Sequence, residues 1–152
     1  MKLLVFGVAL FACSARSTAP SITRDVVFVC EHGAAKSVVA SAYFNKLAAE
    51  RGLAIRSIAR GADPQAELSV AAVKGLTTDG LPPEPVGPRP LSAADVRSSA
   101  SVVAFDCEQP AMKALRGMDV CWNDVPAVAE DYARARDRIR TRVEALIAQI
   151  AK

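Results

Sequence analysis

Short apolar segments alternate along this chain with longer segments in which apolar residues recur at helical spacing. Runs rich in Val, Ile and Phe are typical of strands, and they occur at 25–29, 53–59, 101–105 and 119–122. Apolar residues spaced by three or four positions predict helices at 37–51, at 68–75, from 92 onward, and at 130–150. The stretch 77–90 contains five prolines and two glycines, which predicts a loop without regular structure.

The order of these elements predicts the fold class. Strands that alternate with helices form a parallel sheet covered by helices on both faces, an α/β architecture. In such sheets ligands bind at the carboxyl ends of the strands, near the point where the strand order reverses. Ser92, with Asp95 three residues later, predicts a helix start with an approximate capping box. The last helix is predicted to bury one stripe of side chains: Tyr132, Ala135, Ile139, Val143, Leu146 and Ile150.

The segment between the first strand and the first helix carries the candidate chemistry. It reads Cys30-Glu31-His32-Gly33-Ala34-Ala35-Lys36-Ser37. A cysteine that leaves a strand just before a helix begins lies among backbone N–H groups and the positive end of a helix dipole, an arrangement that binds tetrahedral anions. The same field stabilises a thiolate, so Cys30 is a candidate nucleophile. The alternative is a buried structural cysteine before an ordinary turn.

Each residue near Cys30 has two possible roles. A carboxylate at Glu31 repels a dianion unless its side chain points outward. His32, the single histidine of the chain, is either a counter-charge to the thiolate or a surface residue. Ser37 either donates a hydrogen bond to the thiolate or is only an N-terminal helix residue. No His, Cys and carboxylate cluster has the spacing of a metal site, so we expect neither a metal nor another cofactor.

The strand–Cys-x5-basic-Ser–helix arrangement, preceded by Val26-Val-Phe-Val29, resembles the low-molecular-weight protein tyrosine phosphatases and the related thioredoxin-coupled arsenate reductases. The resemblance covers about 25–152. It implies a three-layer α/β sandwich of the phosphotyrosine phosphatase I-like type, with a four-stranded parallel sheet in the order 2-1-3-4. The chain departs from the family pattern in three places: Lys36 stands where the family has arginine, Gly33 where it usually has asparagine, and Ala35 near the place where many members have a second cysteine.

The resemblance implies cysteine-dependent hydrolysis of phosphate monoesters, in particular phosphotyrosine, through a thiophosphate intermediate. Cys30 attacks phosphorus, and the amides of the loop with Lys36 hold the oxygens. Asp124 matches the position of the family's general acid, and its alternative is an ordinary turn residue. Because an ammonium is a point charge and lacks the planar fork of arginine, a second hypothesis is a catalytically impaired oxyanion-binding protein. The expected partner is therefore a phosphorylated substrate or an inorganic oxyanion.

A third hypothesis is a thiol-linked arsenate reductase, in which Cys30 forms an arseno adduct and Cys107 and Cys121 pass the disulfide outward. The same two cysteines could instead pair with each other in an oxidising compartment, which would leave Cys30 as the free thiol. The spacing in sequence does not decide between these alternatives.

The N-terminus adds a prediction about localisation. Lys2 precedes an apolar run, 3–12, which is typical of a secretory signal and too short to span a bilayer. The run ends in Leu10-Phe-Ala-Cys13, which resembles the lipobox of bacterial lipoproteins. We therefore expect a signal and tether at 1–23 and a folded domain at 24–152. Cys13 is expected to carry a lipid, so that the protein is exported and meets the membrane only through this anchor. The alternative is a first strand of a cytoplasmic protein.

Length and charge narrow the picture further. A chain of 152 residues supports one domain with its own core. The net charge of +3 favours contact with anions but is too small to indicate nucleic-acid binding. Nothing in the sequence indicates the oligomeric state.

Overall fold

The structure, a computed structural model, describes residues 25–152. Its strands are β1 (Val26–Cys30), β2 (Ser57–Gly61), β3 (Ser101–Phe105) and β4 (Val120–Trp122). Its helices are α1 (Lys36–Glu50), α2 (Val70–Thr78), α3 (Ala93–Ser98), α4 (Pro110–Lys113) and α5 (Tyr132–Ile150). The predicted signal and tether at 1–23, with the lipid site Cys13, lie outside the described residues.

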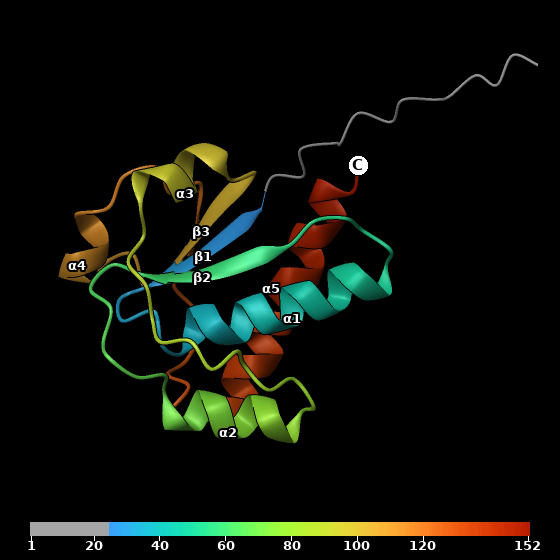
Figure 1. Cartoon of the computed structure of the whole chain (residues 1–152), viewed down its shortest axis with the longest axis horizontal. Coiled ribbons are helices and arrows are strands. Elements are labelled where there is room, and N and C mark those ends of the chain that lie inside the picture. Colours follow the sequence, from blue (N-terminus) through green and yellow to red (C-terminus); the bar gives the residue numbers. More distant parts are fainter. Residues whose placement is uncertain (1–24) are drawn as a thin grey trace, which may run out of the picture.

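The four strands form one parallel sheet in the order β2-β1-β3-β4, which confirms the predicted fold class and strand order. All five residues of β1 are buried, as expected for a central strand whose two faces are both covered. Helices α1 and α5 cover one face of the sheet, and α3 and α4 lie on the other side (Figure 1). Because β1 and β3 pair in parallel, their carboxyl ends lie next to each other, and the Cys30 loop begins there.

An aromatic cluster fills the core between the sheet and α1. The ring of Phe28 lies 5.8 Å from that of Phe44 on α1 and 5.7 Å from that of Trp122 on β4. Trp122 also makes an edge-to-face contact with Phe105, with the ring centroids 5.5 Å apart. These contacts tie the central strands β1 and β3 to the short edge strand β4.

The predicted stripe of α5 is largely confirmed. Five residues of the helix are buried: Ala135, Ile139, Val143, Leu146 and Ile147. Tyr132 and Ile150, at the two ends of the predicted stripe, are half-buried against the same core. The capping box of α3 is also confirmed, because Ser92 Oγ accepts from the Asp95 N–H and the Asp95 carboxylate accepts from the Ser92 N–H. No helix of the described chain is both long and apolar enough to cross a bilayer.

Three element predictions need correction. The second strand lies at Ser57–Gly61, four residues later at its start than predicted, because β1 begins only at Val26 and pairs there with Ser57. The second helix runs from Val70 to Thr78, with Ser69 as its N-cap, so it continues into the stretch predicted as loop. Pro90, at the end of that stretch, forms an isolated parallel bridge with Gly61. The four-residue helix α4 was not predicted.

Helix α2 is fixed at both ends. At its C-terminus the Asp79 carboxylate accepts hydrogen bonds from Tyr43 on α1, at 2.7 Å, and from Tyr132 on α5, at 2.6 Å. Burial, followed by the bond to Asp79, raises the pKa of Tyr43 to about 12. Before its N-terminus, the Ser69 N–H donates to the carbonyl of Ala34 at 3.0 Å. The segment that leads into α2 is therefore hydrogen-bonded to the Cys30 loop at Ala34.

Candidate active site

Cys30 lies at the carboxyl end of β1, and α1 begins six residues later at Lys36. The thiol is almost completely buried, and its Sγ lies 3.1 Å from the buried hydroxyl of Ser37. Either group could donate this hydrogen bond; with a thiolate, the donor is the Ser37 hydroxyl. Cys30 is the one free cysteine among the described residues.

The backbone of the loop is oriented so that its carbonyl groups bind the segment that follows β2. The carbonyls of four loop residues accept hydrogen bonds from amides at 62–69: Cys30, Glu31, His32 and Ala34. Within residues 25–152, no group accepts a hydrogen bond from the amides of 31–36. These N–H groups are therefore available to an anion, in a concavity that also receives the N-terminus of α1.

Gly33 is required by the shape of the loop. Its φ is +63°, a left-handed conformation that residues with a side chain rarely adopt. A Cβ at this position would lie 2.8 Å from the backbone nitrogen of Gly61 and 2.9 Å from its Cα. Any side chain at this position would therefore meet the backbone of Gly61.

Lys36 is held by two acceptors. Its Nζ donates to the Asp106 carboxylate at 2.5 Å and to the carbonyl of Val125 at 2.6 Å. The Lys36 side chain is only 13% exposed. Because an ammonium has three N–H donors, these two acceptors leave one donor unused. Neither acceptor was predicted from the sequence, although Asp106 directly follows β3, whose carboxyl end adjoins that of β1.

Glu31 and His32 lie on the outer side of the loop. The Glu31 carboxylate is 3.7 Å from His32 Nε2, and His32 Nδ1 is 3.2 Å from the Asp63 carbonyl oxygen. Both side chains are well exposed. Glu31 therefore points outward, the orientation in which it interferes least with a bound dianion. None of the described contacts joins His32 to Cys30. Ala34 is buried, and Ala35 is partly buried against the main core.

Asp124 binds two arginines of α5. One carboxylate oxygen accepts from Arg142 Nε at 2.8 Å, and the other lies 3.1 Å from Arg138 Nε. The hydrogen bond from Arg142, together with the charges of both arginines, holds the pKa of Asp124 below its ordinary value. In this arrangement Asp124 is ionised, whereas a general acid must carry a proton, so its catalytic role stays a prediction. The spacing of four residues between Arg138 and Arg142 places them on one helix face and was the available sequence signal.

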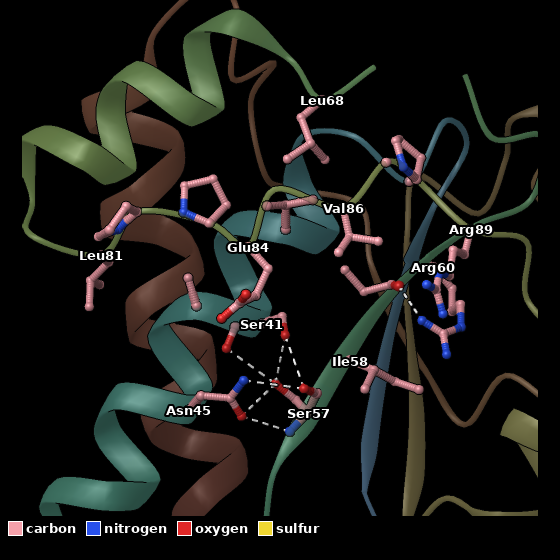
Figure 2. A pocket seen from close by; sticks show the side chains of 18 of the residues that line it. Ser41, Asn45, Ser57, Ile58, Arg60, Leu68, Leu81, Glu84, Val86 and Arg89 are labelled. Carbon is pink, nitrogen blue, oxygen red and sulfur yellow. Dashed lines mark hydrogen bonds between the residues drawn. The ribbon is translucent and has the colours of Figure 1, made fainter. Parts of the chain in front are cut away.

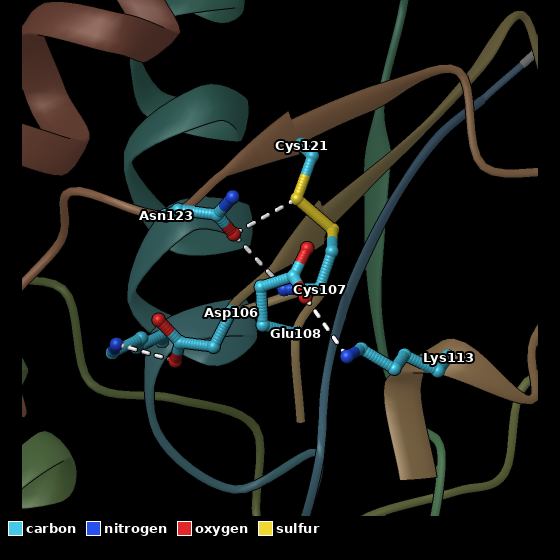
Figure 3. The surroundings of a disulfide bond; sticks show 7 residues. Asp106, Cys107, Glu108, Lys113, Cys121 and Asn123 are labelled. Atoms are coloured by element: carbon cyan, nitrogen blue, oxygen red, sulfur yellow. Dashed lines mark hydrogen bonds and ion pairs between the residues drawn. A yellow bond between two sulfur atoms is a disulfide. The ribbon is translucent and has the colours of Figure 1, made fainter. Parts of the chain in front are cut away.

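Cys107 and Cys121 form a disulfide, one of the two alternatives left open above (Figure 3). Their Cα atoms are 6.2 Å apart, and the bond links the segment after β3 to β4. Cys121 is exposed and Cys107 is partly exposed.

A cavity of about 610 Å³ lies beside the loop, between α1, β2 and the 81–89 segment (Figure 2). Of its lining residues, only Gly33 belongs to the Cys30 loop. Its polar wall is formed by Ser41, Asn45 and Ser57, whose side chains hydrogen-bond to one another and to the backbone of β2. The cavity therefore touches the Cys30 loop at Gly33 and does not reach Cys30 itself. Within residues 25–152 no group of three or more His, Cys, Asp or Glu side chains could hold a metal ion.

Comparison with known proteins agrees with this geometry. The family model described as low molecular weight phosphotyrosine protein phosphatase matches residues 25–120, more than half of the chain. The chain belongs to this family. The phosphatase family match includes the whole Cys30 loop and Cys107, and it ends before Cys121 and Asp124. A search of curated protein sequences finds no match.

Solved structures similar to this member of the phosphatase family come from several organisms. YfkJ from Bacillus subtilis is 21% identical, with a TM-score of 0.76, over 88% of this chain and 98% of its own. The YwlE arginine phosphatase, in a mutant with a phosphorylated active-site serine, is 20% identical, with a TM-score of 0.68, over 84% and 96%. An arsenate reductase from Archaeoglobus fulgidus is 24% identical, with a TM-score of 0.66, over 81% and 98%. At these identities the likeness shows the fold.

Proposed function

We propose that this protein hydrolyses phosphate monoesters through Cys30. The observation that carries the proposal is the loop itself: a single buried thiol beside Ser37, at a helix N-terminus, with backbone amides that bind no other group of the described chain. Membership of the phosphatase family supports the same chemistry.

The proposed reaction has two steps. The Cys30 thiolate attacks phosphorus, the bond from phosphorus to the ester oxygen breaks, and a thiophosphate forms. A water molecule then attacks phosphorus, the S–P bond breaks, and phosphate leaves with the thiolate restored. The loop amides and the free N–H of Lys36 stabilise the charge on the non-bridging oxygens in both steps. Because Arg142 and Arg138 lower the pKa of Asp124 and favour its ionised form, esters with a stable leaving group, such as aryl phosphates, are the substrates best suited to this site.

Lys36 is expected to limit the rate. A guanidinium has five N–H donors in a planar fork, so an arginine could bind Asp106 and Val125 and still hold two oxygens of the substrate. A lysine retains one donor after making the same two bonds. The loss of one donor to a transition-state oxygen costs about 2.7–4 kcal/mol in known cases, which corresponds to about a hundred- to a thousandfold in rate.

Turnover of p-nitrophenyl phosphate tests the proposal. We expect slow turnover by the wild type, none by Cys30→Ser, and an increase of about ten- to a thousandfold in Lys36→Arg. Lys74→Arg, which makes the same change at an exposed lysine, is the matched control and should leave the rate unchanged. If neither the wild type nor Lys36→Arg exceeds buffer, the loop binds oxyanions without hydrolysing esters.

Thiol-linked arsenate reduction is the second candidate, and the Cys107–Cys121 disulfide is the observation in its favour. Cys107 follows β3, the strand that pairs with β1, and a thiol relay would end in such a disulfide. In that reaction two thiols lose two electrons to form the disulfide, and As(V) gains them to become As(III). Reduced protein should then lose two thiols for each arsenate added, and an unchanged thiol count would exclude this activity.

We also propose that the protein is exported and anchored by a lipid on Cys13. The support is the sequence alone: Lys2, the apolar run at 3–12, and Leu10-Phe-Ala before the cysteine. An oxidising compartment is also consistent with the disulfide.

A further inference from the structure

The disulfide links the two segments that hold Lys36. Asp106, the first acceptor, directly precedes Cys107, and Val125, the second acceptor, follows Cys121 by four residues. These segments leave the carboxyl ends of two different strands, β3 and β4. The disulfide therefore connects the residue next to Asp106 with the strand that precedes Val125, and Figure 3 shows Asp106 and Asn123 on either side of it in sequence.

Hydrogen bonds reinforce this link. The Asp106 N–H donates to the carbonyl of Trp122 at 3.3 Å, and the Cys107 N–H donates to Asn123 Oδ1 at 2.9 Å. The same Asn123 oxygen lies 3.0 Å from the Sγ of Cys121. Asn123 thus contacts both halves of the disulfide.

The two acceptors of Lys36 differ in how they are fixed. Val125 is 3% exposed, so its position follows from the core. The Asp106 side chain is 35% exposed, and its backbone has a φ of +50°, a left-handed conformation that aspartate tolerates better than most residues, so neither burial nor β3 geometry fixes it. The links to β4 are therefore what keeps Asp106 opposite Val125.

We propose that the Cys107–Cys121 disulfide and Asn123 act together as a brace that positions Lys36 for oxyanion binding at the Cys30 loop. The reason is the chemistry of lysine: its ammonium ends a flexible stem, so its place depends on fixed acceptors, whereas arginine has a rigid fork of its own. Because the ammonium is tetrahedral, two N–H bonds directed at fixed acceptors also fix the direction of the third N–H. The inference rests on the proposed function of the loop.

The disulfide of the brace is accessible to reductants. Cys121 is exposed and Cys107 partly exposed, so a dithiol can reach the bond. One dithiol would give two electrons and two protons to the S–S bond, produce two thiols, and become a disulfide itself. Apart from the two bonds of Lys36 itself, the segment after β3 would then be joined to the segment after β4 by hydrogen bonds alone, from the Asp106 N–H to Trp122 and from the Cys107 N–H to Asn123.

Lysine acetylation of the folded full-length protein tests the brace without any need for turnover. Mass spectrometry of peptides gives the rate at each lysine, in the wild type and in Cys107→Ser/Cys121→Ser. Lys36 should react slowly in the wild type and on the order of tenfold faster in the double variant, because its two acceptors separate more often. The exposed Lys74 is the internal control and should not change.

Two further variants separate the brace from a general loss of stability. Val143→Ala removes buried atoms from α5 and should lower stability without raising the acetylation rate of Lys36. Asn123→Ala keeps the disulfide and should give a smaller increase at Lys36, which provides a result even if the double variant does not fold. An unchanged Lys36 rate in both brace variants, or an equal increase in Val143→Ala, would overturn the proposal.

Protection of Cys30 from iodoacetamide by inorganic phosphate connects the brace to function. In protein that keeps Lys36, we expect Cys107→Ser/Cys121→Ser to raise the phosphate concentration that gives half-protection by about three- to tenfold. The same two changes should raise it less in protein that also carries Lys36→Arg. Protection that is unaffected by brace variants refutes the brace and leaves the anion site intact. A wild type that phosphate does not protect refutes the anion site, and the brace with it.

Discussion

The substitution Gly33→Ala tests whether the close approach of the Cys30 loop to β2 shapes the anion site. The added Cβ would lie 2.8 Å from Gly61 N, 2.9 Å from Gly61 Cα and 3.1 Å from the carbonyl carbon of Arg60. Ordinary contacts of this kind are about half an ångström longer or more, and Gly61 cannot retreat easily because its amide donates to the Arg89 carbonyl at 2.8 Å. The left-handed backbone costs an alanine about 1–2 kcal/mol, and overpacking adds about 1–3 kcal/mol.

Gly52→Ala is the matched control. Gly52 has a similar φ of +66°, but nothing lies within 4 Å of the place of its Cβ. It should therefore lose only the backbone part, about 1–2 kcal/mol. Urea unfolding gives both losses, and Gly33→Ala should exceed Gly52→Ala by about 1–3 kcal/mol. Gly33→Ala alone should also weaken phosphate protection of Cys30. Equal losses of stability in the two variants would show that the contact with Gly61 does not constrain the loop.

Three further predictions concern other carboxylates and the N-terminus. Asp124→Asn should change the turnover of phenyl phosphate by less than about tenfold, since an ionised Asp124 donates no proton; a fall of about a hundredfold or more would establish it as the general acid. Burial opposes ionisation of Asp95, but hydrogen bonds from Arg60 and Ser92 outweigh it and lower its pKa to about 2. Because that pKa is depressed in the folded state, the stabilisation is present above about pH 4 and is lost as the pH falls toward 2. Urea unfolding at pH 7 should therefore give Asp95→Asn a free energy of unfolding about 2 kcal/mol below that of the wild type, and this difference should shrink near pH 2. A difference in the free energy of unfolding that does not depend on pH would contradict the assignment. Intact mass of protein from membranes should show a chain that starts at Cys13 with added acyl mass, and an unprocessed Met1 species in the cytosol would refute the lipid anchor.

The sequence predicted those elements whose pattern comes from their own burial. β1 and β3 are continuous apolar runs because both faces of each strand are covered, and the stripe of α5 follows its one buried face. The second strand was misplaced because Leu53 and Ile55 do alternate with exposed residues, yet the observed pairing of β2 with β1 begins only at Ser57, opposite Val26. Helix α4 is too short for any periodicity to appear.

The candidate site divides in the same way. Cys30, the loop glycine and Ser37 are local in sequence, so a strand–loop–helix pattern was sufficient to find them. The acceptors of Lys36 are not local: Asp106 is 70 residues away and Val125 is 89 residues away. Contacts over such separations depend on the sheet order, which a single sequence shows only through a resemblance.

Trp122 gives this protein a built-in optical probe. It is the single tryptophan of the chain, it is 3% exposed, and its ring packs on Phe28 and Phe105. Its chain neighbours are Cys121 and Asn123, so one indole reports at once on the aromatic core and on the segment that braces Lys36. Its emission should shift to longer wavelength when the core opens to water.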